Sequence, residues 1–314
     1  MNTINISGVP HVYEFTPSKS SSSSQSSVLI FIHGWLLSRH YWQPIIKQLN
    51  QKYSCLSYDL RGFGDSVSRE NFHNSSLETE KYDLASYAND LKLLLKELNI
   101  KKAWLIGHSL GGSIALWNAY FSPQQIQGVI CINAGGGIYL KEEFERFRKA
   151  GAKIVKKRPQ WLCYIPFIDL IFARTMVVKP LARHWGRQRV LDFVKAEEQA
   201  ALGSLMETTT QEQVHKLPQL VSELKQPAYF IAGDGDKVME TKYVNHLASF
   251  HYLFQPHGKN VMELSECGHF AMIERSKTVI SKIDSILTHH EEFSTSSSIN
   301  SSLEFLQNSC IKSI

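Results

Sequence analysis

The sequence predicts an α/β fold in which a mostly parallel, doubly wound sheet is flanked by helices and carries one inserted helical segment. Short apolar runs recur without polar alternation, which is typical of strands covered on both faces. These runs cover residues 28–32, 54–58, 103–106, 129–132 and 229–231. Amphipathic stretches separate them, and the clearest, at residues 83–98, places Leu, Ala and Tyr on one helical face. Strands alternating with helices indicate parallel pairing, and such sheets carry their chemistry at the carboxyl ends of the strands.

The chain divides into four predicted parts. Residues 1–27 form an N-terminal strand followed by a serine-rich loop, because a serine tract has little apolar surface to bury. Residues 28–135 and 217–288 form the α/β core, and residues 136–216 interrupt it as a helical insertion. Residues 289–314 are rich in Ser and Asn and are expected to be disordered.

Composition excludes several classes of protein. Hydrophobic residues make up 43% and charged residues 20% of the 314 residues, as in ordinary globular domains. No apolar run is long enough to predict a transmembrane helix. Five cysteines without a C-x-x-C pair argue against a disulfide framework and a zinc site. The N-terminal residues lack the pattern of a secretory signal, so a cytoplasmic location is expected.

A serine stands where a strand is predicted to turn sharply into a helix. Residues 107–111 read G-H-S-L-G between the apolar run 103–106 and a helical stretch at 113–121. Glycines flank the turn because β-carbons there would collide with neighbouring backbone. Such a turn raises the Ser109 hydroxyl above the sheet edge, where backbone N–H groups at the helix start face a developing oxyanion. Ser109 is therefore the expected nucleophile.

A serine nucleophile needs a histidine to take its proton, and the histidine needs a carboxylate to orient it. Among thirteen histidines, His269 is selected because it lies between a predicted strand at 260–264 and a helix, on a loop at the active edge. His246, His251 and His257 lie in more polar stretches and are expected at the surface.

The orienting carboxylate is expected in the sequence G-D-G-D, which follows the apolar run 229–231. The G-x-x-D spacing selects Asp236 and leaves Asp234 as a turn residue. Ser109, Asp236 and His269 then follow one another in the chain order expected for a nucleophile elbow on a doubly wound sheet.

Two further turns follow predicted strands. The sequence His-Gly-Trp ends the first of them, and the backbone N–H of Trp35 is expected to pair with that of Leu110 as the oxyanion hole. The loop at 59–66 contains Asp59 and Arg61, which are expected to hold a tight turn by hydrogen bonds and to take no catalytic part.

These motifs together resemble the α/β-hydrolase superfamily. HGW, D-x-R-G-x-G-x-S, GHSLGG, G-x-x-D and G-H-F-x-x-x-E match in order across residues 28–288. The resemblance implies the α/β-hydrolase fold, a helical cap formed by 136–216, and a serine hydrolase of the esterase or lipase kind. Residues 31–66 are also similar to cofactor-free haloperoxidases and perhydrolases, which often have Met where Leu110 stands. A haloalkane dehalogenase or an epoxide hydrolase would need an aspartate in place of Ser109.

The expected cap is strongly basic and contains an apolar run. Residues 146–195 carry thirteen Lys and Arg against Asp169 and Asp192, and the apolar run lies within residues 161–178. Pro166 and the charged residues prevent this run from spanning a bilayer. The cap either buries its apolar face on the core with solvated cations outside, or docks on an anionic membrane with aromatics in the lipid interface. No recognition motif for nucleic acid occurs, so nucleic acid is not an expected partner.

The sequence therefore predicts an enzyme that cleaves a carboxylic ester, or a related acyl bond, of a hydrophobic substrate through an acyl-enzyme on Ser109. The substrate is expected to be a small-molecule or lipid ester, and no metal or organic cofactor is required. The alternatives are a triad-dependent carbon–carbon hydrolase or elimination enzyme, a cofactor-free perhydrolase, and a hydrolase-like binding protein without catalytic activity.

Overall fold

A computed structural model describes residues 1–20, 27–67, 81–135, 141–254 and 260–292. The chain consists of two units, Met1–Ser276 and Lys277–Ile314. None of the helices formed by the described residues has the length and apolar character that a membrane crossing requires.

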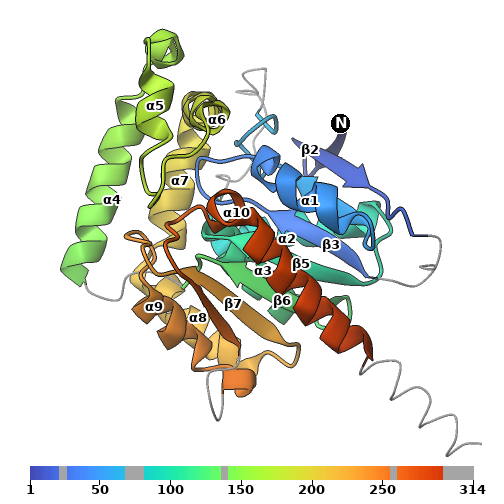
Figure 1. Cartoon of the computed structure of the whole chain (residues 1–314). Helices are drawn as coiled ribbons and strands as arrows, with labels where there is room; N and C mark the ends of the chain where they lie inside the picture. The colour runs from blue at the N-terminus through green and yellow to red at the C-terminus, as the bar shows by residue number, and fades with distance from the viewer. Residues whose placement is uncertain (21–26, 68–80, 136–140, 255–259, 293–314) are drawn as a thin grey trace, which may run out of the picture. The chain divides into compact units, whose positions relative to one another are not determined.

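The first unit is built on an eight-stranded sheet with the strand order β1-β2-β4-β3-β5-β6-β7-β8 (Figure 1). The strands are β1 (Asn2–Ile6), β2 (Val9–Thr16), β3 (Val28–Ile32), β4 (Cys55–Tyr58), β5 (Ala103–His108), β6 (Ile126–Ile132), β7 (Ala228–Gly233) and β8 (Val261–Leu264). β3 to β8 pair in parallel, whereas β1 and β2 add an antiparallel edge. The predicted α/β class with a mostly parallel sheet is confirmed.

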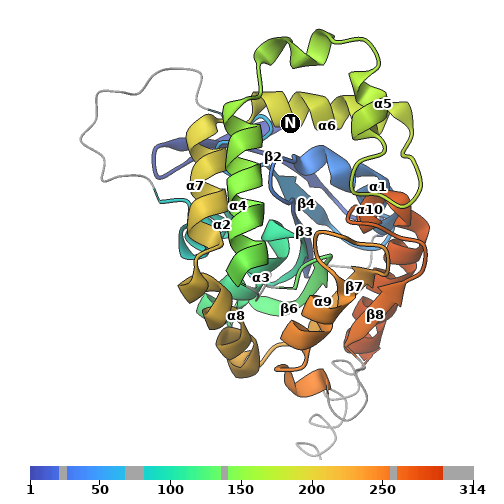
Figure 2. The same ribbon diagram turned by 90° about the vertical axis from the view of Figure 1, so that its left-hand side faces the viewer.

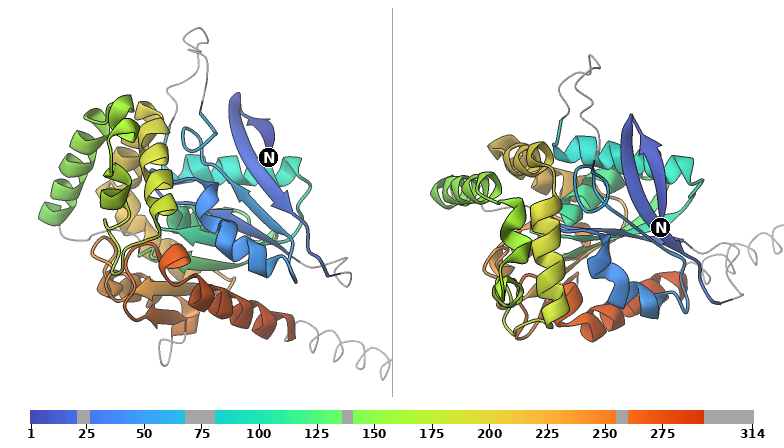
Figure 3. Two further views of the ribbon diagram at one scale, coloured as in Figure 1. Left: turned by 45° about the horizontal axis from the view of Figure 1, so that its top comes forward. Right: turned by 90° about the horizontal axis from the view of Figure 1, so that it is seen from above.

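Helices cover both faces of this sheet. Figure 3 shows α2 (Leu84–Glu97) and α3 (Leu110–Phe121) on one face and α1 (Gln43–Leu49) on the opposite face. The side chain of Asp83 caps α2 by accepting a hydrogen bond from the Ser86 N–H at 2.7 Å. The apolar face predicted from the helical spacing of residues 83–98 is buried against the sheet and α3.

The register of the central strands brings their carboxyl ends to one edge. Ile32 lies beside Gly107, and His108 lies beside Ile132, which in turn pairs with Ile231. The loops that follow β3, β5, β6 and β7 therefore leave the sheet at the same level. Residues separated by more than a hundred positions in the chain meet at this edge.

The segment between β6 and β7 forms a group of helices beside the sheet (Figure 2). Its elements are α4 (Lys141–Lys156), the 3₁₀ helix η2 (Gln160–Tyr164), α5 (Ile168–Phe172), α6 (Arg183–Lys195), α7 (Glu198–Thr208) and α8 (Gln211–Glu223). α4 contacts α7, and α6 contacts both η2 and α5. α8 runs across residue 216, the expected end of the insertion, and contacts α3 and α9 (Thr241–Ala248).

The second unit is helical as far as residue 292 in its described part. The tail was expected to be disordered from residue 289, but residues 289–292 continue this helix. The composition of the tail did not indicate where the helix ends. Residues 293–314 of that tail, and residues 21–26 of the expected serine-rich loop, lie outside the described residues.

Candidate active site

The turn between β5 and α3 forces an unusual backbone conformation on Ser109. Its φ is 51° and its ψ is −118°, which residues with a β-carbon rarely adopt. The flanking glycines permit this turn. A β-carbon on Gly107 would lie 2.2 Å from the Gly111 carbonyl oxygen, and one on Gly111 would lie 2.3 Å from the Ile32 carbonyl oxygen. The G-x-S-x-G spacing is therefore a steric requirement of this turn.

Ser109, His269 and Asp236 lie in hydrogen-bonding contact. The Ser109 Oγ is 3.2 Å from His269 Nε2, and His269 Nδ1 is 2.8 Å from Asp236 Oδ2. Because a carboxylate can only accept, the His269 proton belongs on Nδ1, and Nε2 is left to accept the serine proton. The three side chains come from loops after β5, β7 and β8, and His269 immediately precedes α10 (Ala271–Glu274).

The Asp236 carboxylate is held at both oxygens. Oδ1 accepts the backbone N–H groups of Val238 and Met239 at 2.8 and 3.0 Å, and Oδ2 accepts from Asn133 Nδ2 at 2.9 Å as well as from His269. Burial alone would raise the pKa of Asp236, but the charge and hydrogen bond of His269 and the two N–H groups outweigh it and hold this pKa below its ordinary value. Asp236 is thus kept ionised beside the imidazole.

The sequence pattern did not reveal the part played by Asn133. This residue directly follows β6 and has a φ of 49°, and its amide also donates to the Gly268 carbonyl at 3.2 Å. It thus links the loop that carries Asp236 to the loop that carries His269. Its place directly after a buried parallel strand was the available signal, since polar residues at such positions reach the edge where the strand ends meet.

His108 supports the backbone of His269. Its Nε2 donates to the His269 carbonyl oxygen at 2.7 Å, and the two rings lie 4.9 Å apart between centroids. Burial, with a contribution from the nearby His269, lowers the pKa of His108 to about 3, so its ring is neutral. A β-carbon on Gly34 would lie 2.7 Å from His108 Nδ1, which explains the glycine after His33.

The two expected oxyanion donors are the backbone N–H groups of Leu110, which follows Ser109 in the chain, and of Trp35, in the loop after β3. Leu110 is the first residue of α3, and Trp35 follows β3 in a turn where Leu36 has a φ of 56°. No acceptor among the described residues takes the backbone N–H of either Trp35 or Leu110. The His33 ring accepts the Leu60 N–H at 2.9 Å through Nε2, and its Nδ1 lies 2.8 Å from the Gly34 carbonyl oxygen.

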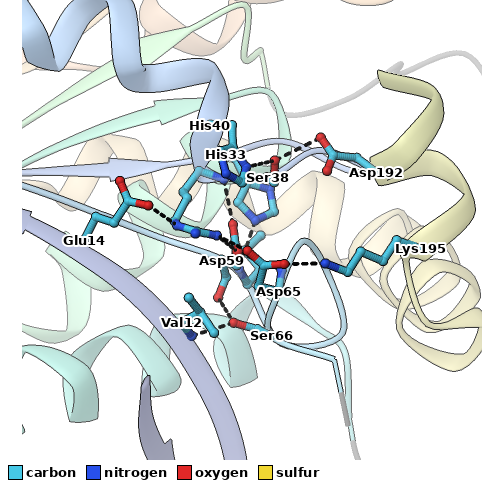
Figure 4. Close-up of polar contacts among 12 residues, drawn as sticks. Val12, Glu14, His33, Ser38, His40, Asp59, Asp65, Ser66, Asp192 and Lys195 are labelled. Carbon is cyan, nitrogen blue, oxygen red and sulfur yellow. Dashed lines mark hydrogen bonds and ion pairs between the residues drawn. The ribbon is translucent and has the colours of Figure 1, made fainter. Parts of the chain in front are cut away.

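A polar network holds the loop that follows β3 (Figure 4). The buried Asp59 carboxylate accepts the Arg39 N–H at 2.6 Å, the Arg39 guanidinium at 2.5 Å and the Asp65 N–H at 2.8 Å. Arg39 also forms ion pairs with Glu14 and Asp65. Asp59 therefore holds a turn, as expected, and Arg61 likewise forms an ion pair with Asp90 at 3.2 Å.

The same network reaches α6. Ser38 Oγ donates to Asp192 Oδ2 at 2.9 Å, and Asp65 forms an ion pair with Lys195 (Figure 4). Burial raises the pKa of Asp192 to about 7, against the opposing hydrogen bonds of Ser38 and Gln188. The loop that carries Trp35 is thus fixed to the helical insertion by side chains of α6.

Three other histidines were expected at the surface, and one of them is buried. His246 is exposed as expected, but His251 is buried, and the expectation of a surface position was wrong. Its Nε2 lies 3.0 Å from the carbonyl oxygen of Gln226, a partner that local polarity could not reveal. His257 lies outside the described residues. Within the described ranges, no group of three or more His, Cys, Asp and Glu is arranged to hold a metal ion.

Part of the chain is similar in sequence to known hydrolases. Residues 27–162 match a family model described as the alpha/beta hydrolase fold. A pimeloyl-[acyl-carrier protein] methyl ester esterase of Pseudoalteromonas atlantica is 33% identical over 103 residues, which are 33% of this chain and 35% of that protein. A soluble epoxide hydrolase of Corynebacterium sp. is 28% identical over 110 residues, 35% of each chain. The chain spans about a third of the length of the curated relatives that it matches.

Solved structures match over more of the chain. A thermophilic esterase from Thermogutta terrifontis has a TM-score of 0.69 at 17% identity, with 92% of this chain and 99% of that chain covered. At this identity the likeness shows a common fold and nothing further about this chain.

Proposed function

Because residues 27–162 match the model of the α/β-hydrolase fold family, we propose that the chain is a serine hydrolase that cleaves a carboxylic ester or a related acyl bond through an acyl-enzyme on Ser109. The observation that carries this proposal is the continuous hydrogen-bonded path from the Ser109 hydroxyl through His269 to Asp236, with 3.2 Å and 2.8 Å separations. An imidazole held by a carboxylate in this way can act as a general base for the hydroxyl.

Each group has a defined part in the proposed reaction. The Ser109 oxygen attacks the acyl carbon while His269 Nε2 takes its proton, and the Asp236 carboxylate stabilises the imidazolium that forms. The carbonyl oxygen becomes an oxyanion, which the N–H groups of Trp35 and Leu110 stabilise. His269 then gives the proton to the leaving oxygen, and the C–O bond to that oxygen breaks. Water, deprotonated by His269, releases the acid and regenerates Ser109.

A hydrophobic substrate is favoured by the residues around the nucleophile. Trp35, Leu36, Leu110 and Met239 are half-buried apolar side chains that pack at the margin of the core. They belong to the loop after β3, the start of α3 and the loop that carries Asp236. An acyl chain or aromatic group placed there would lose water from both surfaces.

Ester turnover with matched serine variants tests the proposal. Hydrolysis of a nitrophenyl ester by Ser109→Ala is expected to fall to background, because no nucleophile remains. Ser113→Ala is the control, since Ser113 lies one turn further along α3 and its N–H bonds to the Ser109 carbonyl without joining the triad. Unchanged turnover by Ser109→Ala would contradict the proposal and leave a binding protein, or another reaction, as the better account.

Pre-steady-state kinetics separates the alternatives that use the same triad. An acyl-enzyme that forms faster than it is hydrolysed releases a burst of nitrophenol of about one equivalent per enzyme. A carbon–carbon hydrolase or elimination enzyme gives no such burst with any ester. A perhydrolase would form the acyl-enzyme but transfer the acyl group to peroxide in preference to water. The alternative in which the cap docks on an anionic membrane involves other residues and is independent of the ester chemistry.

A further inference from the structure

The four most exposed large apolar side chains among the described residues of the helical insertion lie within eleven positions of one another in the chain. Trp161 and Tyr164 in η2, Phe167 just before α5, and Ile171 in α5 are 62%, 84%, 65% and 62% exposed. We call these four residues the docking tip. The segment that joins α4 to α5 crosses the end of the insertion farthest from the sheet in both views (Figure 1, Figure 2). Trp161, Tyr164 and Phe167 of the docking tip are therefore carried on the outermost part of the insertion.

Packing of the insertion on itself does not account for this exposure. Other apolar residues of the same segment turn inward: the Phe172 ring lies 5.7 Å from that of Phe193, and Ala173 is buried. A segment that only covered the core would bury its aromatic side chains in the same way. Phe167 also has a φ of 62°, a conformation disfavoured for a residue with a β-carbon. Several exposed apolar side chains within one short segment are typical of a contact surface.

Lys and Arg residues lie on both sides of the docking tip in the chain. Residues 153–187 contain eight Lys and Arg and one carboxylate, Asp169. Arg183 and Arg187 both bond to Asp169, and the hydrogen bond from Arg183 contributes most to holding the pKa of Asp169 below its ordinary value. The Arg183 guanidinium also lies 5.8 Å from the centre of the Phe167 ring. One carboxylate shared by two arginines leaves a net positive charge beside the exposed ring.

Further cations of this stretch lie toward solvent. Lys156 and Lys157, which precede η2, and Arg174, which follows α5, are exposed. Within the described residues none of these three forms an ion pair with a carboxylate. Positive charge is therefore available on both sides of the docking tip in the chain.

We propose that the docking tip binds the surface of an anionic phospholipid bilayer. The aromatic rings of Trp161, Tyr164 and Phe167 insert at the level of the headgroups, while Lys156, Lys157 and the neighbouring arginines contact the lipid phosphates. Aromatic side chains surrounded by cations are the composition that interfacial segments use, and anionic lipid is the partner that matches this charge. The segment lies on the bilayer without crossing it, because Pro166 and Asp169 interrupt it.

Vesicle co-sedimentation of the full chain tests the proposal. The Ser109→Ala variant is used so that hydrolysis cannot alter the lipid, and binding is then measured whether or not the proposed ester chemistry is correct. Vesicles of phosphatidylcholine with about 30% phosphatidylglycerol should bind the protein at least about tenfold more tightly than phosphatidylcholine alone. Raising sodium chloride from about 0.05 M to about 0.5 M should release most of it. Equal binding to both kinds of vesicle, or none to either, overturns the proposal.

Matched variants locate the contact. Replacing Trp161 and Phe167 by Ala should lower partitioning at least about tenfold, and replacing Lys156 and Lys157 by Gln should lower it to a similar extent. The control replaces Phe250 and Tyr252 by Ala, because these are also exposed apolar side chains but lie beyond α9, outside the insertion. Thermal unfolding of each variant verifies that the chain remains folded.

Three results would overturn the assignment. The first is equal loss of binding in the control variant, because the contact would then be non-specific. The second is a monomer–dimer equilibrium in sedimentation velocity that Trp161→Ala abolishes while vesicle binding is unchanged, because the occupant would then be a second copy of the chain. The third is binding to heparin that competes with vesicles but does not depend on Trp161 or Phe167, because the surface would then be a general polyanion site.

Discussion

Asn133 donates a hydrogen bond to Asp236 at 2.9 Å, and it does so at Oδ2, the same carboxylate oxygen that accepts the N–H of His269. The amide and the imidazole thus fix this oxygen from two sides, while backbone N–H groups hold the other oxygen. The carboxylate of the candidate triad is therefore positioned by a residue that comes from a third strand end.

Loss of this amide should slow the chemical step. We expect Asn133→Ala to lower kcat about tenfold with little change in KM, because the carboxylate loses one of the hydrogen bonds that fix its orientation toward His269. The matched control is Asn118→Ala, since Asn118 is also buried and donates to the Ala88 carbonyl oxygen within the helical layer. The control should lower stability and leave kcat nearly unchanged. Equal losses of kcat would mean that Asn133 has no special relation to the triad.

Backbone strain at the nucleophile should be measurable as stability. Ser109 has a φ of 51°, which glycine tolerates and alanine does not. Both Ser109→Gly and Ser109→Ala remove the nucleophile, but we expect the glycine variant to be about 1 kcal/mol more stable, the strain relieved being partly offset by the greater flexibility of the unfolded chain. Urea unfolding of the two variants provides the comparison. An alanine variant of equal or greater stability would show that the turn is not strained.

The buried carboxylate of Asp192 should make stability depend on pH. Burial raises its pKa from 3.8 to about 7 in the folded chain. The unfolded chain is therefore ionised there while the folded chain is still protonated, and the free energy of unfolding should fall as pH rises from about 4 to about 7. Between these pH values the free energy of unfolding of Asp192→Asn should fall by about 2–4 kcal/mol less than that of the wild type.

The measurement for Asp192 is urea unfolding at several pH values, with Asp234→Asn as the control because Asp234 is an exposed aspartate. The control should follow the wild-type dependence. Parallel curves for wild type and Asp192→Asn would contradict the assignment of this carboxyl group as protonated in the folded chain.

His108 should remain neutral over the whole range in which an ordinary histidine titrates. Burial lowers its pKa from 6.5 to about 3, so the folded chain resists a protonation that the unfolded chain accepts below about 6.5. The contribution to stability is therefore lost as pH falls from about 6.5 toward about 3. The ring proton signals of His108, assigned with His108→Gln, should not move between about pH 5 and about pH 8. A midpoint near 6.5 would mean that the ring is accessible to water.

The fold, and the meeting of Ser109, Asp236 and His269 in space, were largely predictable because their signals are local. Apolar runs of strand length marked the central strands, and the glycines around Ser109 marked a turn that only glycine permits. Asp236 and His269 each lie in a loop that follows a strand, so the parallel sheet brings these loops to one edge. Asp236 and His269 are thirty-three positions apart in the chain. They meet because β7 and β8 are neighbouring parallel strands, so the loops after them leave the sheet side by side.

The features that the sequence did not predict depend on partners far away in the chain or on which way a side chain faces. Asn133 is defined by Asp236, which lies 103 positions away, and His251 is buried through a bond to the Gln226 carbonyl. The apolar run of the insertion did not reveal which side chains face inward, because helices and turns alternate there within a few residues. Only the three-dimensional path separates the exposed Trp161 and Phe167 from inward-turned residues such as Ala173.

The most direct test of the account is the mass of the enzyme during turnover of an ester. Acid quenching in the steady state, followed by digestion and mass spectrometry, should show the acyl group on the peptide that contains Ser109, and hydroxylamine should remove it. The Ser109→Ala protein should carry no acyl group under the same conditions. Full ester turnover with the acyl group on another residue, or with the same turnover in Ser109→Ala, would contradict the central claim.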